Sequence, residues 1–514
     1  MKRTLLLFAL VLILAFAAAT PASAANTQLL VQSTLSAPSM NLVCLLRGCQ
    51  VTQSVNGSPN VFVLSVSSST NVQFLVSSLS NVPGILSVTV TSSSQNPVGN
   101  RYIVRTTGGL LNLRLLCILN LCQILQPLDG SLNQVFLIGG SSGQDPNLLL
   151  AILRAVPGVL NAELDQTVTV ITGGATATDP PPSLVDTTPV SYYGTTVWNG
   201  YVNQPATQII RLAQAQQNFA TAGTGVIADI DTGVDPNHPV LKPALLTGYD
   251  FTRNQAGASE MNDLPGGSAA PESPCVNCAP GKVNQHSIAM VDQHSIAMVD
   301  QPGFEAFGHG TMVAGVLHLV APKASILPLK AFGPDGSGNL SDILRAIYFA
   351  AQNNANVVNM SFDLKTPSQE LATAVTSAEK QGIVFVASAG NDGQMEMVYP
   401  AGLTNVMGVA STNSRDQRSS FSNYGNQIVW VAAPGEAVIT TYPFGTYAAA
   451  WGTSFSAPMV SGGVSLLQGL QPNLDQTHAQ AAMAQAQLLL ALGMGNGRID
   501  LYRAAGSFSS TGNH

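Results

Sequence analysis

Three short segments each place a polar side chain where an apolar strand ends or a helix begins. Asp231 lies in ADIDTGVD, His309 in FGHGTMVAG and Ser454 in WGTSFSAPMVSG. A serine hydroxyl is a poor nucleophile unless an imidazole takes its proton, and the imidazole needs a carboxylate to fix its tautomer and stabilise its charged form. Each segment alone is also typical of a turn, a packed histidine or a helix cap. Together they contain the residue types of nucleophilic acyl transfer.

In this chain order the three segments resemble the signatures of the subtilisin-like serine peptidases, the subtilases, over roughly residues 205–506. The resemblance implies an α/β catalytic domain with a mostly parallel sheet covered by helices on both faces. It also implies that Asp231 orients and supports the imidazole, that His309 is the general base and then the general acid, and that Ser454 is the acylating nucleophile.

A fourth segment, VFVASAGNDG, places Asn391 after a buried strand and Ala-Gly. Acyl transfer requires a preorganised donor directed at the oxyanion, and one such donor is worth on the order of 3 kcal/mol in subtilisin. Asn391 matches the oxyanion-hole asparagine of the family, and the backbone N–H of Ser454 would be its companion. An ordinary Gly-Asn-Asp-Gly turn is the alternative, which the other three segments disfavour.

The resemblance further implies substrate-binding strands in FGPDGSGNLS and NMSFDL, to which an extended peptide would add as a further strand. The candidate substrate-binding residues are Gly336, Ser337, Gly338, Ser361, Phe362, Asp363, Ala389 and Gly390. Asp363 stands where many relatives have glycine. A carboxylate beside the primary pocket would narrow the pocket, favour a basic side chain, or remain a solvated loop charge, and the sequence leaves all three open.

The elements that must position these residues alternate along the chain. Apolar periodicity predicts strands over 225–231, 325–332, 355–361 and 382–390, and helices over 311–321 and 340–354. Ser454 is expected just ahead of a helix with Pro458 in its first turn, where proline is tolerated. Strands that alternate with helices of this length favour a largely parallel sheet covered on both faces.

The N-terminus and the composition indicate export. A charged start, an apolar run from Leu5 to Ala19 and the small residues before position 25 predict a secretory signal peptide over 1–24. The apolar run is shorter than the ~20 residues that a membrane-spanning helix needs. With 9% charged residues and a formal net charge of −7, a nucleic-acid partner is not expected. We therefore expect a secreted protein, extracellular or periplasmic, without a membrane anchor after signal cleavage.

A repeat with an offset of 73 to 74 residues fills the region before residue 173. NVPGILSVTV in the first copy corresponds to AVPGVLNAEL in the second. We expect two small α+β units of β-α-β character at 25–100 and 101–172, with the leucine-rich run 110–125 as a buried strand region. The resemblance implies that the second unit is a propeptide that chaperones the peptidase domain and then blocks its cleft. The first unit would inhibit less directly, dock elsewhere, or only pack against the second.

A proline-rich and threonine-rich segment follows the repeats. Its three consecutive prolines cannot donate hydrogen bonds to a sheet, which predicts a linker over 173–204. The peptidase domain would then span 205–506 with an insertion at about 252–305, and a tail at 507–514 would end the chain.

The six cysteines fall in three close pairs, and an oxidising compartment favours disulfides. The candidates are Cys44, Cys49, Cys117, Cys122, Cys275 and Cys278. Connectivity does not follow from the sequence, and no further ligands complete a zinc site around the last pair.

The insertion also contains the octad QHSIAMVD written twice. Eight residues separate His286 from His294, which puts them on different helix faces or about 26 Å apart on a strand. We interpret the stretch as a duplication in a surface loop, so that the catalytic histidine is His309. The remaining histidines are expected to be structural or exposed: His238, His318, His478 and His514.

We expect a secreted serine endopeptidase that is made as an autoprocessed zymogen and acts on protein or peptide substrates. Its own prodomain would be its chaperone and inhibitor, and no cofactor is expected in the chemistry. A catalytically idle binding protein on the same fold and an esterase are the alternatives. Calcium commonly stabilises this family, but no acidic cluster has convincing ligand spacing, so the metal stays unassigned.

Overall fold

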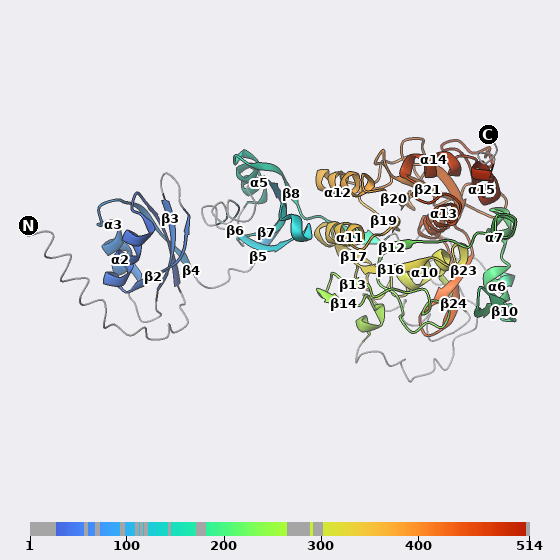
Figure 1. Cartoon of the computed structure of the whole chain (residues 1–514), viewed down its shortest axis with the longest axis horizontal. Coiled ribbons are helices and arrows are strands. Elements are labelled where there is room, and N and C mark those ends of the chain that lie inside the picture. The colour runs from blue at the N-terminus through green and yellow to red at the C-terminus, as the bar shows by residue number, and fades with distance from the viewer. Residues whose placement is uncertain are drawn as a thin grey trace, which may run out of the picture. The chain divides into compact units, whose positions relative to one another are not determined.

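The structure is a computed structural model that describes residues 27–55, 60–66, 72–92, 98–107, 113, 117, 122–141, 145–170, 181–264, 288–290 and 302–509. Its contacts divide the chain into two compact units, Met1–Gln126 with Leu137–Ala162, and Pro127–Phe136 with Glu163–His514 (Figure 1). The predicted signal peptide, the Cys275/Cys278 pair, His286, His294 and His514 lie outside the described residues. In the part that the structure describes, no helix has the length and apolar character to cross a bilayer.

The first unit contains two four-stranded sheets of the same strand order. The first sheet, β2-β3-β1-β4, is formed by β1 (Thr27–Ser33), β2 (Cys49–Val55), β3 (Asn60–Val66) and β4 (Ile85–Ser92), with helices α2 (Ala37–Arg47) and α3 (Val72–Ser80). The second, β6-β7-β5-β8, is formed by β5 (Val98–Thr106), β6 (Cys122–Pro127), β7 (Val135–Ser141) and β8 (Val159–Leu164), with α5 (Pro146–Ala155). Each sequence repeat therefore forms a larger unit than the β-α-β expected.

The leucine-rich run is the clearest correction in this unit. Leu113 and Cys117 are helical, whereas β6 begins at Cys122, so the strand predicted over 110–125 is wrong at these two positions. An apolar run without alternation is compatible with a buried helix as well as a buried strand, which is why periodicity failed here.

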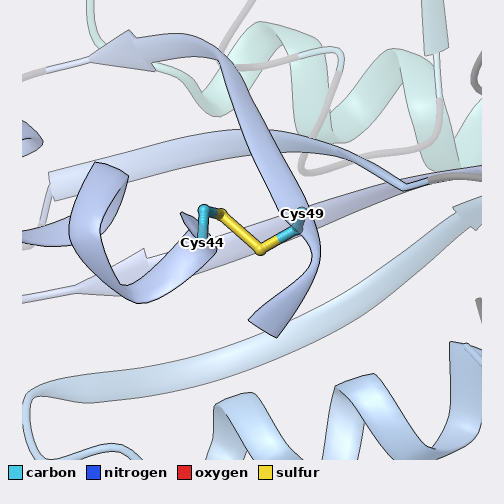
Figure 2. The surroundings of a disulfide bond; sticks show 2 residues. All are labelled: Cys44 and Cys49. Carbon is cyan, nitrogen blue, oxygen red and sulfur yellow. A yellow bond between two sulfur atoms is a disulfide. The ribbon is translucent and has the colours of Figure 1, made fainter. Parts of the chain in front are cut away.

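Two disulfides are present in the described residues. Cys44, near the end of α2, bonds to Cys49 at the start of β2 with their Cα atoms 4.5 Å apart (Figure 2). Gly48 lies between them with a φ of 74°, and this left-handed turn brings the chain back onto the helix end. The second pair, Cys117 and Cys122, has the same spacing, with Cα atoms 4.4 Å apart.

The second unit is built on an eight-stranded sheet of order β14-β13-β16-β12-β18-β20-β21-β22. Its strands are β12 (Val226–Asp231), β13 (Tyr249–Asp250), β14 (Gln255–Ala256), β16 (Ser325–Lys330), β18 (Val357–Met360), β20 (Val384–Ser388), β21 (Met407–Thr412) and β22 (Val431–Pro434). All neighbours run parallel except β13 and β14 at one edge. The mostly parallel sheet predicted from the sequence is confirmed.

Four long helices cover this sheet: α10 (His309–Val320), α11 (Leu340–Gln352), α12 (Gln369–Glu379) and α13 (Thr453–Gln468). They pack in pairs, α10 with α13 and α11 with α12 (Figure 1). Strands β18, β20, β21 and β22 are buried along their whole length, which requires cover on both faces. Smaller elements complete the unit: α7 (Pro205–Ile209), α8 (Leu212–Asn218), α14 (Gln476–Met483), α15 (Leu501–Ser509), and β15 (Ile288–Met290) paired with β24 (Thr446–Ala450) and β23 (Val438–Tyr442).

The predicted linker is wrong over much of its length. Residues 182–202 form η2 (Pro182–Val185), β10 (Pro189–Tyr192), β11 (Thr195–Trp198) and α6 (Asn199–Val202). The Tyr192 hydroxyl donates to the Leu319 carbonyl at 2.5 Å and the Tyr201 hydroxyl to Gly315 at 2.7 Å, both buried against α10. Aromatic residues that bury hydroxyls in this way bind the segment to the core, whereas its proline content suggested an extended linker. At the other end of the unit, α15 extends to Ser509, into the predicted tail.

A buried carboxylate ties together the two elements that carry Asp231 and His309. Glu260, in η3 (Glu260–Asp263), is fully buried and lies in the predicted insertion. It accepts hydrogen bonds from the Gly308 N–H at 2.9 Å and the Thr232 hydroxyl at 3.2 Å, and a third from the Thr311 hydroxyl. The end of β12 and the start of α10 are thereby joined through one side chain.

A buried ammonium lies beside this carboxylate. Lys330 at the end of β16 donates to the carbonyls of Thr232 at 2.6 Å and Phe332 at 2.7 Å, and to the Asp263 carboxylate at 2.8 Å. All three donors of the ammonium are satisfied, which a fully buried charge requires. Arg253 also pairs with Asp263, so η3 is anchored from two sides.

Glu260 should make stability depend on pH. Burial raises its pKa from 4.5 to about 8, and the bond from Thr311 and the charge of Lys330 oppose this only in part. Because the folded-state pKa is raised, the contribution is full below pH 4.5 and is lost as the pH rises through about 8. Glu260→Gln cannot ionise, so between about pH 5 and pH 9 it should lose on the order of a few kcal/mol less unfolding free energy than the parent.

Urea unfolding at about pH 5, 7 and 9 measures this difference. Glu379→Gln, at the partly exposed end of α12, is the matched control and should follow the parent. Parallel pH profiles of parent and Glu260→Gln would contradict the assignment.

Candidate active site

The sheet brings Asp231 and His309 together, 78 residues apart in sequence. Asp231 is the last residue of β12, and His309 is the first residue of α10. The imidazole Nδ1 lies 2.8 Å from Oδ1 and 3.0 Å from Oδ2 of the carboxylate, while the Thr232 N–H donates to Oδ1 at 2.6 Å. Both side chains are almost wholly buried, at 1% and 4% exposure, so water screens the contact little.

Ser454 is the second residue of α13 and is fully buried. The ring of Phe455, the next residue, lies 5.5 Å from the imidazole of His309, which places the start of this helix beside the histidine. Nε2 of His309 is buried and makes no hydrogen bond within the described part of the chain. The site therefore has an unused imidazole nitrogen next to the segment that carries the serine.

Pro458 lies further inside α13 than predicted. The helix begins at Thr453, so Pro458 is past the first turn and lacks the N–H that would bond to the Ser454 carbonyl. The Ser361 hydroxyl donates to that carbonyl instead, at 3.0 Å. Proline thus leaves an acceptor at the helix start, and Ser361, between β18 and β19, uses it to hold Ser454 in place.

Asn391 is oriented by the same helix start. Its Oδ1 accepts from the Thr453 N–H and from the Thr453 hydroxyl, both at 2.9 Å. Its Nδ2 is buried without a hydrogen-bond partner among the described residues. A Cβ on Gly452 would lie 3.2 Å from that Nδ2, so glycine leaves the amide room beside Ser454. The Asn391 amide N–H is therefore held in place without a partner among the described residues, and Thr453, which holds it, directly precedes Ser454.

The predicted substrate-binding segments lie on either side of a strand from the end of the second repeat. β9 (Thr167–Val170) is the middle strand of a three-stranded sheet between β17 (Ser337–Asn339) and β19 (Phe362–Asp363), and both neighbours run antiparallel to it. The Val170 N–H donates to the Gly336 carbonyl at 2.8 Å. Residues from the end of the second repeat therefore occupy the edges where a peptide was expected.

The remaining predicted substrate-binding residues border the same place. Ala389 and Gly390 follow β20 and lead directly into Asn391.

Just before β9, the Asp165 carboxylate accepts from the Ser341 N–H at 2.8 Å and from its hydroxyl at 2.9 Å. The segment is thus held by side-chain bonds as well as by strand pairing.

Asp229 is a site residue that the sequence reading missed. It precedes Asp231 by two residues on β12, is 1% exposed, and its Oδ1 accepts from the Asn359 amide at 3.0 Å. Burial first, and the charge of Asp231 second, raise its pKa well above the usual range. Asn359 also accepts from Ser461 at 2.8 Å and donates to Ser361 at 3.1 Å. Asp229 thus supports the residues that hold α13, a role that the adjacent Asp231 motif obscured.

The described residues contain no group of three or more His, Cys, Asp or Glu side chains arranged to hold a metal ion. Two other histidines are buried in structural positions. His238 Nε2 lies 3.0 Å from the Thr446 carbonyl, and His318 Nδ1 lies 3.2 Å from the Tyr201 hydroxyl. Exposed His478 lies 2.7 Å from Asp475.

The chain is similar to a known family of proteins and to several of its members. The model of the subtilase family matches residues 223–501. Thermitase from Thermoactinomyces vulgaris is 34% identical over 266 residues, which cover 49% of this chain and 79% of thermitase. Subtilisin BL from Lederbergia lenta is 38% identical over 175 residues, which cover 32% of this chain and 65% of that protein.

Among solved structures, fervidolysin from Fervidobacterium pennivorans, described as a keratinolytic enzyme related to subtilisin, matches with a TM-score of 0.59. The match covers 79% of this chain and 61% of fervidolysin at 19% identity, so it bears on the fold alone. The family model covers more than half of the chain and the thermitase match most of that enzyme. The chain therefore belongs to the subtilase family and is a serine-type endopeptidase.

Proposed function

We propose that this endopeptidase works through Asp231, His309 and Ser454 as a catalytic triad and that it is made as an autoprocessed zymogen. One observation carries the proposal. Nε2 of His309 and Nδ2 of Asn391 are both buried and without partners in the described part of the chain, and both lie at the segment that carries Ser454. Buried polar groups without a hydrogen-bond partner lower the stability of the fold, and they persist where a reaction uses them.

The chemistry follows from the positions of these groups. His309 Nε2 takes the proton of the Ser454 hydroxyl as Oγ attacks the peptide carbonyl, and Asp231 at Nδ1 stabilises the imidazolium. The amide of Asn391 and the N–H of Ser454 stabilise the oxyanion of the tetrahedral intermediate. His309 then gives its proton to the leaving amine, and water hydrolyses the acyl-enzyme by the reverse sequence.

The zymogen part of the proposal depends on the register of β9. Val170 is opposite Phe362 and Thr169 is opposite Asp363, so β9 runs toward Ser361. The carbonyl of Ser361 lies 3.5 Å from the Ser454 hydroxyl. A peptide that continued this register by one residue would have that residue opposite Ser361, so we expect self-cleavage between Ile171 and Thr172, the residues that follow Val170 in the sequence.

The two repeats would form a prodomain in this scheme, the second supplying β9 as inhibitor. Secretion through the signal sequence at 1–24 completes the proposal, because disulfide-bonded repeats suit an oxidising compartment. An idle binding protein is not favoured, since such a protein has no use for the unspent imidazole and amide. An esterase would turn over esters without cleaving casein.

Ser454→Ala should abolish peptide hydrolysis and self-processing together, because both need the same acyl-enzyme. The purified variant should retain residues 25–172 by mass spectrometry, and a fluorophosphonate probe should label the parent but not the variant. Ser377→Ala, on the exposed side of α12, should behave as the parent. Normal maturation of purified Ser454→Ala would contradict autoprocessing.

Asn391→Ala should lower kcat by about two to three orders of magnitude and leave KM nearly unchanged, since the lost bond forms mainly in the transition state. Steady-state kinetics on one peptide substrate separate the two parameters. Asn353→Ala, at the solvent-exposed end of α11, is the control. An effect confined to KM would argue against the oxyanion role.

The mature enzyme should begin at Thr172 if β9 keeps its register during the first cleavage. N-terminal sequencing of protein matured in a dilute, purified sample tests this, because later trimming by other molecules is then slow. A two-residue deletion of 167–168 should move the first cleavage two residues along the chain. A start that is unchanged in that variant would rule out the register argument.

A further inference from the structure

Asp363 is the last residue of β19, the strand that pairs with β9. Its side chain makes no hydrogen bond and no ion pair within the part of the chain that the structure describes. A Cβ on Gly390 would lie 2.9 Å from its Oδ2, which places the carboxylate against the glycine that precedes Asn391. A carboxylate so placed lacks the partner that partly buried charges normally have.

Strand geometry determines which substrate side chains share a face with this carboxylate. Directly opposite residues of an antiparallel pair point to the same face, and faces alternate along the strand. Val170 and Phe362 are opposite each other and both buried, so the other face carries Asp363, the residue opposite it and the residue opposite Ser361. In β9 the residue opposite Asp363 is Thr169. The residue opposite Ser361 is the one whose carbonyl Ser454 would attack, and the contact of Asp363 with Gly390, just before Asn391, places the carboxylate toward that residue.

The surrounding charges reinforce the field of Asp363. Asp392 and Glu396 are both close enough to raise its pKa, and only Lys365 opposes them. Lys365 is 57% exposed and already pairs with Asp392 at 3.4 Å and Glu396 at 3.2 Å. Three carboxylates therefore face one solvated ammonium, and the region attracts a further cation.

Burial is the main cause that raises the pKa of Asp363, to about 6. The carboxylate is therefore mostly charged at neutral pH and mostly neutral near pH 5. An ammonium or guanidinium held beside it would favour the charged form, whereas an aliphatic side chain would favour the neutral one.

We propose that Asp363 is the specificity-determining residue of this peptidase and selects lysine or arginine immediately before the scissile bond. The inference rests on the proposed function, since it assumes that Ser454 attacks the carbonyl of the residue opposite Ser361. Of the three roles that the sequence left open for this carboxylate, it would then have that of a partner for a basic side chain.

Ile171, which follows Val170 in the sequence, is neutral and lies outside the described residues. Self-cleavage after Ile171 would not require the preferred side chain, because the segment is tethered and its effective concentration replaces affinity.

The test uses the matured enzyme and peptide p-nitroanilides that share one sequence and differ only in Lys, Arg or Leu before the scissile bond. At about pH 8 the parent should prefer Lys or Arg over Leu by about tenfold or more in kcat/KM, and Asp363→Asn should lower that ratio by about tenfold. The ratio for the parent should rise between about pH 5 and pH 7.5, and it should be flat for Asp363→Asn. Asp475→Asn, at a remote carboxylate whose side chain is 50% exposed, is the matched control and should keep the parent ratio.

A preference of the parent for Leu, or an equal ratio in parent and Asp363→Asn, would overturn the inference. Titration with a fluorophosphonate counts active sites in each variant, and Asp363→Gly provides a second substitution if the asparagine variant folds poorly. Mapping the bonds that the parent cleaves in denatured casein gives an independent readout without any variant. If no peptide is cleaved and no probe reacts, the proposed function itself fails, and this outcome is distinct from altered selectivity.

Discussion

The contact between Asp231 and His309 is the constraint on which the rest of the catalytic unit depends. A carboxylate and an imidazole that are both nearly buried can keep a 2.8 Å separation only if the ends of β12 and α10 are held together. Glu260 joins those ends by hydrogen bonds to residues on both sides, and the Lys330 ammonium donates to the Thr232 carbonyl in the turn after β12. The insertion that contains Glu260 is therefore, in this part, a structural support of the site.

Ser454 is positioned through a hydrogen bond that α13 itself does not make. Pro458 cannot bond to the Ser454 carbonyl, and Ser361, between β18 and β19, donates to that carbonyl instead. Asn359, on β18, in turn contacts Asp229 and α13. The sheet and α13 are thus coupled through a small polar network, and the buried atoms without a partner among the described residues include Nε2 of His309 and Nδ2 of Asn391.

The edges of β17 and β19 pair with the backbone of an extended segment, whose side chains alternate between two faces. They hold β9 by main-chain pairing, which any extended peptide can imitate. Val168 and Val170 are buried on one face of β9, while Thr169, on the other face, is opposite Asp363. In the proposed zymogen, inhibition by the chain's own segment and selection of a foreign substrate would therefore use the same strands but different side chains.

The sequence alone determined the family, the four residues proposed for catalysis, the candidate substrate-binding segments and the alternation of strands and helices in the second unit. These depend on local signals: glycine-flanked motifs, apolar periods and turn residues. It could not locate Glu260 or Asp229 in the site, it mistook the segment around Tyr192 and Tyr201 for a linker, and it assigned a strand where Leu113 and Cys117 are helical. Each of these depends on partners that are distant in sequence, or on an apolar run that fits two conformations equally well. Only the tertiary structure decides them, because burial and hydrogen bonding between remote residues leave no periodic trace in the chain.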